Sequence, residues 1–168
     1  MNYTVGELMN KLKEFPKGAK VELDCSESGV FEELVLDKIG NKVVIFGNGG
    51  SAADSQHFAA ELIGRFKLER KSLPAIALTT DSSIITALGN DYGFEYVFSR
   101  QCESIVHKDD IIFAISTSGH SKNVINGVIT SKKIGAITIG LIGGDGGGLQ
   151  QSVDFPIIAP SISTPRIQ

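Results

Sequence analysis

The sequence has only two cysteines, no long apolar run and no cluster of basic residues, and each shortage excludes a class of protein. No stretch approaches the roughly 20 apolar residues that a membrane-spanning helix requires. The N-terminal residues lack the apolar core of a signal peptide, so we expect none. Cys25 and Cys102 have no metal-ligand spacing. We therefore expect a cytoplasmic protein with reduced thiols and no membrane partner.

The basic residues are scattered along the chain. The 16 Lys and Arg residues are outnumbered by 19 Asp and Glu residues, which gives a formal net charge of -3. Binding of nucleic acid needs Lys and Arg gathered on one face, so we expect no nucleic-acid partner. The 168 residues, 42% of them hydrophobic, are enough for one globular core.

From residue 42 onward, short apolar runs alternate with amphipathic segments. The runs predict strands at 42–46, 74–78, 110–116, 136–142 and 154–160. The segments predict helices at 51–67, 94–106 and 121–134, with a short helical stretch before the last strand. Continuous apolar strands separated by helices are typical of a parallel sheet covered on both faces. The predicted fold class is therefore α/β, with a doubly wound, five-stranded parallel sheet.

The first 40 residues have a different pattern. A short helix is predicted at 4–15, a strand is possible at 20–24, and the region is acidic. We therefore divide the chain into an atypical N-terminal segment, 1–40, and one domain, 41–168. The pattern leaves open whether the segment is a separate module or an altered start of the domain.

The first strand of the predicted sheet is followed by GNGGSAAD, residues 47–54. Glycines let the backbone turn tightly beside a ligand, and the free N–H groups of a helix N-terminus favour an anion. Ser51 and Asp54 match a capping signature that would start the helix. A plain strand-to-helix turn explains the loop equally well. A dinucleotide site fits the glycine spacing, but the acidic residue expected about 20 residues on is missing, because Asp81 lies further away.

The sequence STSGHS, residues 116–121, follows the third predicted strand and places four hydroxyl groups and a glycine before a helix. Hydroxyl and backbone N–H groups together can bind phosphate oxygens without a lysine. Ser121 alone would be enough to cap the helix. Four hydroxyl groups exceed that need, so the loop predicts a phosphate site.

His57 and Glu61 are four residues apart in a predicted helix and so share one face. A carboxylate there is suited to removing a proton next to a carbonyl, and the pair is also suited to binding a metal ion. Spacing alone favours a surface ion pair. Asn90 and Asp91, in GNDYGF, are predicted to lie in a turn between helical stretches.

Six segments occur in order over residues 42–168: GNGGSAADSQHFAAELIGRF, LPAIALTTD, TALGNDYGFEYVFSRQ, DIIFAISTSGHSKNV, GGDGG and TPRIQ. Together they resemble the phosphoheptose isomerases of the sugar-isomerase (SIS) domain class. The resemblance implies a flavodoxin-like sheet and a homotetramer with active sites between subunits. It also implies conversion of sedoheptulose 7-phosphate to D-glycero-D-manno-heptose 7-phosphate, a precursor of the heptose in lipopolysaccharide.

The resemblance assigns roles by position. Glu61 would be the catalytic base, and in members that bind zinc it would be a ligand together with His57 and Gln168. Substrate would contact Glu61, Gln168 and residues of the loops, namely Asn48, Gly49, Gly50, Ser51, Asn90, Asp91, Ser116, Thr117, Ser118 and Ser121, the last four holding the phosphate.

Two features depart from the family pattern. Family members continue past RIQ into a helix with a catalytic histidine that also binds zinc, whereas this sequence stops at Gln168. They also begin with long helices that form the tetramer core, which residues 1–40 do not resemble. We therefore expect weak or no isomerase activity unless another chain supplies the helix.

A second hypothesis is a non-catalytic SIS module that binds sugar phosphates or a protein. The replication-initiator-associating proteins of similar sequence are such modules. They generally lack the helix carboxylate, so the presence of Glu61 favours an enzyme.

Overall fold

The computed structural model describes residues 19–21, 34–36, 41–65, 67, 69–161 and 163–167. The helix predicted at 4–15, the end of the helix predicted at 51–67 and the roles of Gln168 lie wholly or partly outside the described residues. β1 (Ala19–Val21) and β2 (Leu34–Leu36) pair antiparallel in a small sheet of their own. β1 overlaps the strand predicted at 20–24.

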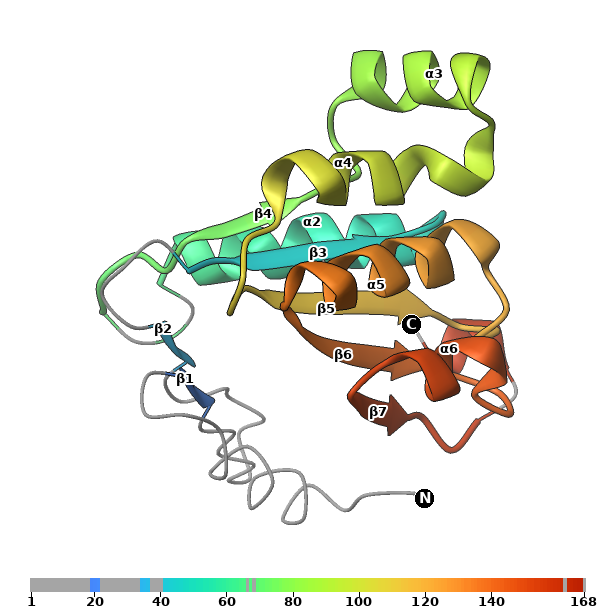
Figure 1. Ribbon diagram of the computed structural model, residues 1–168. Coiled ribbons are helices and arrows are strands. Elements are labelled where there is room, and N and C mark those ends of the chain that lie inside the picture. The colour runs from blue at the N-terminus through green and yellow to red at the C-terminus, as the bar shows by residue number, and fades with distance from the viewer. Residues whose placement is uncertain are drawn as a thin grey trace.

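Five parallel strands form the main sheet, in the spatial order β4-β3-β5-β6-β7 (Figure 1). They are β3 (Val43–Gly47), β4 (Ala75–Ala77), β5 (Ile111–Ser116), β6 (Ile137–Ile142) and β7 (Phe155–Ile158). Numbered along the chain from β3, the order is that of a flavodoxin-like sheet. The predicted five-stranded parallel sheet is confirmed.

Helices cover both faces of this sheet (Figure 1). α2 (Gly50–Ile63) packs on one face, and α4 (Val97–Ile105), α5 (Lys122–Ile134) and α6 (Gly147–Ser152) pack on the other. Neighbouring residues of a strand point to opposite faces, so Val43 contributes to the core under α2 and Val44 to the core under the other helices. Among the described residues, none of the helices has both the length and the apolar composition of a membrane span.

The remaining helices are α3 (Ser82–Asp91), the 3-10 helix η1 (Phe94–Tyr96) and α7 (Thr164–Ile167). The helix predicted at 94–106 is thus η1 followed by α4. The turn predicted for Asn90 and Asp91 is wrong, because both residues belong to α3, and the chain turns at Gly93, whose φ is 97°. α3 begins where the Asp81 carboxylate accepts a hydrogen bond from the Ile84 N–H, a strong N-cap that the pattern analysis did not use.

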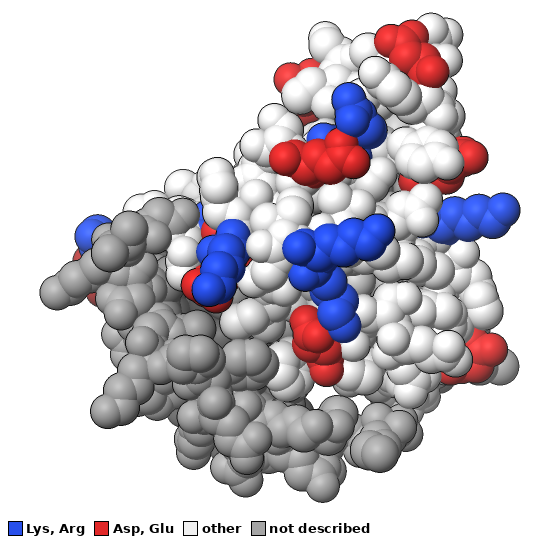
Figure 2. Space-filling view, viewed as in Figure 1, with Lys and Arg blue, Asp and Glu red and all other residues white. Residues whose placement is uncertain are grey.

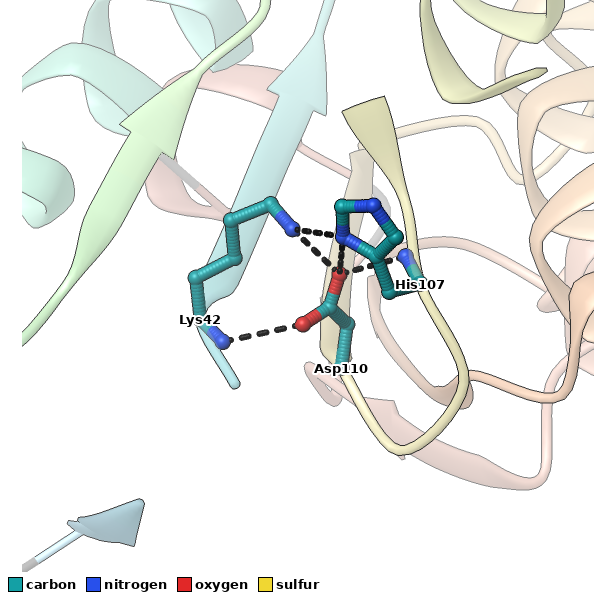
Figure 3. A network of polar contacts seen from close by, with 3 residues as sticks. All are labelled: Lys42, His107 and Asp110. Carbon is teal, nitrogen blue, oxygen red and sulfur yellow. Dashed lines mark hydrogen bonds and ion pairs between the residues drawn. The ribbon is translucent and has the colours of Figure 1, made fainter. Parts of the chain in front are cut away.

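At the N-terminal ends of β3 and β5, the carboxylate of Asp110 joins the two strands (Figure 3). It is fully buried. Its Oδ1 accepts from the Lys42 backbone N–H at 3.0 Å, and its Oδ2 accepts from Lys42 Nζ at 2.6 Å and the His107 backbone N–H at 2.7 Å. Another register would leave this buried charge without its donors, which is costly, so Asp110 favours the observed register of β3 beside β5.

A second carboxylate joins β6 to the start of β7. Asp154 Oδ2 accepts from the Thr138 backbone N–H at 2.9 Å and the Thr138 hydroxyl at 2.7 Å, and Oδ1 lies 2.8 Å from Lys132 Nζ. Burial alone would raise the pKa of Asp154, but the hydrogen bonds from Lys132 and Thr138 outweigh it and lower the pKa below the ordinary value of 3.8.

We predict that Asp154 makes stability depend on pH at the acid end. Because its folded-state pKa is lowered, its stabilisation is present above about pH 4 and is lost as the pH falls through the folded pKa. Denaturant unfolding should show that wild type exceeds Asp154→Asn in free energy of unfolding at neutral pH, and that the gap narrows below about pH 4. Lys132→Gln removes the ammonium partner of Asp154. Its difference from wild type in free energy of unfolding should narrow over the same pH range. A gap that stays constant as the pH falls to about 2 contradicts the prediction.

Candidate functional site

The loops after β3 and β5 emerge side by side from the main sheet. The two strands are parallel neighbours, with Gly47 opposite Ile115, so their carboxyl ends lie at one edge. The chain order of the sheet reverses between these strands. In open α/β sheets, ligands bind outside the carboxyl ends of the strands at this point. The topology therefore brings together the glycine loop, 47–50, and the hydroxyl loop, 116–121.

A pair of reciprocal hydrogen bonds joins the glycine loop to the first turn of α5, directly after the hydroxyl loop. Asn48 Nδ2 donates to Asn123 Oδ1, and Asn123 Nδ2 donates to Asn48 Oδ1, both at 2.8 Å. Asn48 is a predicted site residue, but Asn123 was missed. The available signal was a polar residue in the first turn of α5, directly after the hydroxyl loop.

The glycine loop starts α2 without a side-chain cap. The N-cap is Gly49, with a φ of 57°, and Ser51 and Asp54 both lie inside the helix. The predicted capping box is therefore wrong, because the left-handed glycine starts the helix earlier and Ser51 is buried against Gly47. The first N–H groups of a helix have no acceptor within the helix, so the N-terminus of α2 remains suited to an anion.

The hydroxyl loop is organised by its own side chains. Ser116 Oγ lies 3.2 Å from Ser121 Oγ and accepts from the Gly119 N–H at 3.1 Å, while Ser118 Oγ accepts from the His120 N–H at 3.2 Å. Ser121 is the N-cap residue of α5, but its hydroxyl makes no capping hydrogen bond. The capping explanation for this serine is thus wrong. Its hydroxyl remains able to bond to a ligand, and the ligand roles of Ser116, Thr117, Ser118 and Ser121 stay predictions.

The segment GGDGG supports the hydroxyl loop from the side. Gly119 has a φ of 68°, and a Cβ at this position would collide with the carbonyl oxygen of Gly146. The Leu149 N–H donates to the Gly119 carbonyl at 2.9 Å. His120 Nε2 lies 3.4 Å from Asp145 Oδ1, and both side chains are exposed. The loop is therefore held by close backbone contact, which only glycine permits.

His57 and Glu61 lie together on α2, as predicted. His57 Nε2 is 3.6 Å from Glu61 Oε1, and their side chains are 77% and 36% exposed. Arg70, which sequence reasoning missed, holds the end of this helix: its Nη2 donates to the Glu61 carbonyl at 2.7 Å and its Nη1 to the Leu62 carbonyl at 2.9 Å. A cation at the last carbonyls of a helix is favourable, so Arg70 fixes the turn that carries Glu61.

The carboxylate of Glu61 is not beside the loops within one chain. Glu61 follows Gly50 by 11 residues of α2, which places it roughly 16 Å along the helix axis from the N-terminus. Asn90 and Asp91 are exposed at the end of α3, where Asn90 Nδ2 donates to Asp91 Oδ1 at 2.8 Å. In the part of the chain that the structure describes, no hydrogen bond joins either residue to the loops. The described site residues therefore fall into four groups: the two loops, the pair on α2 and the pair on α3. The two loops are brought together by the contact between Asn48 and the first turn of α5.

The zinc site predicted from the resemblance is incomplete in the described residues. His57 and Glu61 offer a nitrogen and an oxygen donor on one face, and a structural or catalytic zinc ion takes at least three protein ligands. Over the described ranges, no three His, Cys, Asp or Glu side chains are grouped closely enough to hold a metal ion. Gln168 lies outside them.

Among the described residues, one cavity borders the glycine loop and another borders the hydroxyl loop at His120. The smaller, of about 130 Å³, is lined by glycine-loop residues together with side chains of α3, η1 and α4, namely Gly47, Asn48, Gly49, Ala52, Thr79, Ile85, Phe94, Val97 and Phe98. The larger is an open pocket of about 590 Å³ near His120 and Asp145. It contains none of the predicted site residues, so the chemistry of the loops favours the smaller one.

Comparison with known proteins first gives the class. The family model described as SIS domain matches residues 34–143, which include both loops and α2. A phosphoheptose isomerase of Geotalea daltonii is 56% identical over 138 residues, which cover 81% of this chain and 72% of the relative. One of Trichlorobacter lovleyi is 49% identical over 168 residues, covering 99% of this chain and 85% of the relative.

Solved structures agree. The phosphoheptose isomerase of Neisseria gonorrhoeae has a TM-score of 0.71 at 45% identity, covering 76% of this chain and 67% of that one. The phosphoheptose isomerase of Francisella tularensis has a TM-score of 0.72 at 41% identity, covering 76% of this chain and 68% of that one. The chain belongs to the phosphoheptose isomerase family, and the resemblance inferred from the six segments is confirmed.

We predict that Gly119→Ala weakens phosphate binding, because the added Cβ would displace the hydroxyl loop from Gly146. The Kd for inorganic phosphate, followed by NMR titration, should rise at least about tenfold, which corresponds to ~1.4 kcal/mol. Gly89→Ala, in α3, is the control: its Cβ would meet nothing nearer than the Val97 side chain of α4 at 4.0 Å, so the Kd should not change. Equal affinities of the two variants would contradict a phosphate site in this loop.

Proposed function

We propose that this protein is an aldose–ketose isomerase that converts sedoheptulose 7-phosphate to D-glycero-D-manno-heptose 7-phosphate. The observation that carries the proposal is the contact of the glycine loop with the first turn of α5, directly after the hydroxyl loop, through Asn48 and Asn123. It places two helix N-termini and a row of hydroxyl groups around one point of the sheet. The relatives named phosphoheptose isomerase support the choice of sugar.

The phosphate end of the substrate binds at residues 116–121. The Ser121 hydroxyl makes no capping bond, Thr117 is half-buried and Ser118 is exposed. Together with the N-terminal N–H groups of α5, these hydroxyls are the donors that a phosphate monoester dianion requires. The glycine loop, 47–50, binds the hydroxyl groups of the sugar through its backbone, because the Asn48 side chain is paired with Asn123.

The reaction needs one base. Glu61 removes the proton from C1 of the ketose, next to the C2 carbonyl, and the electrons form an enediolate. Return of the proton to C2, together with transfer of the hydroxyl proton from O1 to O2, gives the aldose with its carbonyl at C1 and a hydroxyl group at C2. Hydrogen-bond donors of the loops stabilise the developing oxyanion, which is usually the largest contribution to such catalysis.

The separation of Glu61 from the loops supports a site shared between subunits. We propose a homo-oligomer, a tetramer as in the family, in which Glu61 of one copy reaches the loops of another. None of the ten residues of α3, all of them described, is buried, and the helix stands away from the sheet (Figure 1). Large apolar side chains on α3 and just after it are exposed, namely Ile84, Tyr92, Phe94 and Tyr96. A second copy is the occupant that would bury this surface.

Zinc is part of the proposal as a group that His57 and Glu61 would help to hold. Bound there, it would polarise the carbonyl oxygen of the substrate. The two donors lie 3.6 Å apart on one helix face. No step above depends on the ion.

We further propose that the protein works in the cytoplasm, in the supply of heptose for lipopolysaccharide. Cys102 is free and fully buried, as is usual for a cysteine in a reducing compartment. Burial raises the pKa of its thiol to about 11, which keeps the thiol unreactive. On the face in Figure 2, Lys and Arg stand among Asp and Glu with uncharged surface between them. The absence of a nucleic-acid partner stays a prediction.

We predict that Glu61→Gln abolishes turnover while sugar-phosphate binding remains. Loss of a general base costs about 10²–10⁴-fold in rate, and the loops that bind the phosphate are untouched. Turnover of sedoheptulose 7-phosphate is measured by NMR, and binding by thermal shift. Glu69→Gln is the matched control, because Glu69 is an exposed carboxylate just after α2 that pairs with Arg65. Binding without turnover in wild type would instead support the non-catalytic SIS module.

We predict that Ile84→Glu lowers the mass of the protein in solution. A charge in a buried apolar contact opposes association, and Ile84 is exposed in one chain, so folding should be unaffected. Light scattering coupled to size-exclusion chromatography measures the mass. Ser83→Glu adds the same charge at the neighbouring exposed position and should keep the wild-type mass. An unchanged mass for Ile84→Glu would exclude α3 from the interface.

A further inference from the structure

The proposed reaction gives no role to Asn123. This residue follows the hydroxyl loop in the chain, and its side chain contacts Asn48 of the glycine loop. It is the second residue of α5 and lies 75 positions after Asn48. The two amide groups form a closed pair of hydrogen bonds, each 2.8 Å long. Asn123 is 4% exposed. Burial of an amide group costs free energy unless its donors and its acceptor are hydrogen-bonded. The closed pair with Asn48 supplies these hydrogen bonds.

The orientation of Asn123 is fixed from its own helix as well. Its Oδ1 accepts a second hydrogen bond, from the Val124 backbone N–H at 3.0 Å, so both lone pairs of that oxygen are used. The helix thus orients Asn123, and Asn123 orients Asn48. A side chain must carry a donor and an acceptor on one planar group to make both bonds, which limits the choice to Asn and the longer Gln.

The pair lies between the two parts of the site that the substrate spans. Ser121, the N-cap residue of α5, is two residues before Asn123, and Gly49, the N-cap residue of α2, follows Asn48. The pair therefore sets the distance between the donors for the sugar and the donors for the phosphate. Misplacement of bound groups by about 1 Å can cost on the order of 100-fold in rate.

We propose that Asn123 is a positioning residue of the isomerase reaction, which holds the Asn48 loop at the distance from the hydroxyl loop that the sugar chain requires. This inference rests on the proposed function for its substrate. Inorganic phosphate needs only the hydroxyl loop and the backbone N–H groups at the start of α5, so its binding does not depend on the side chain of Asn123. The sugar phosphate needs both loops, so its binding and turnover do.

The test compares Asn123→Ala, Asn48→Ala and the double variant. We expect kcat/KM for sedoheptulose 7-phosphate to fall about 100-fold in each, with the double variant no worse than either single one, because both remove the same contact. The inhibition constant of inorganic phosphate should stay at the wild-type value. Asn126→Ala is the matched control: it is on the same helix, its Nδ2 donates to the Glu95 carbonyl at 3.0 Å, and its kcat/KM should not change.

Three outcomes overturn the proposal: wild-type kcat/KM in Asn123→Ala, additive losses in the double variant, or an equal loss of phosphate inhibition and sugar turnover, which would mean a collapsed site. If Asn123→Ala does not fold, Asn123→Asp replaces it. An acid makes both bonds to Asn48 only when protonated, so its deficit relative to wild type should shrink as the pH falls, and a deficit independent of pH overturns the proposal.

A wild type without turnover contradicts the proposed function rather than this inference. Thermal shift then carries the comparison, with sedoheptulose 7-phosphate and inorganic phosphate as probes. Asn123→Ala should reduce the shift caused by the sugar phosphate and leave the shift caused by phosphate. Equal responses of wild type and variant to the sugar phosphate overturn the inference.

Discussion

The pairing of β3 with β5 is the constraint on which the site depends. Each end of this pairing is fixed by a polar contact between residues distant in sequence. At the amino end, the buried Asp110 carboxylate holds the backbone and the ammonium group of Lys42. At the carboxyl end, the amides of Asn48 and Asn123 hold each other. A slip of one residue would turn every side chain of β3 to the wrong face and would also separate both contacts.

Glycine then decides how closely the surrounding loops approach. Gly47 leaves room for Ser51 beneath the first loop, and Gly119 lies directly against Gly146 beneath the second. Because these contacts are made by backbone, the loops have few alternative arrangements, and their N–H groups are aimed before any ligand arrives. A prearranged set of donors binds a charged group without first paying for ordering. The same property suits stabilisation of charge that develops during a reaction.

The sequence predicted the sheet well because its strands are buried on both faces and are therefore continuously apolar. The capping box at Ser51 and Asp54 failed because a left-handed glycine starts α2 earlier, a conformation that composition does not specify. α3 was not predicted as an element since its apolar residues are exposed in one chain. Asn123 was missed for another reason: its partner is 75 residues away, and only the fold brings the two amides together.

The position of Glu61 follows from helix geometry rather than from the loops. A helix that starts at the carboxyl edge of the sheet runs back along the strands, so each further turn carries its residues away from that edge. Arg70 binds the carbonyl of Glu61 and stabilises the helix to its last turn, which keeps the carboxylate at that distance. In the proposed oligomer, an acid held there would meet a phosphate-bound sugar where another copy of the chain presents its loops. The same rigid helix would then serve both the stability of one chain and the proposed association.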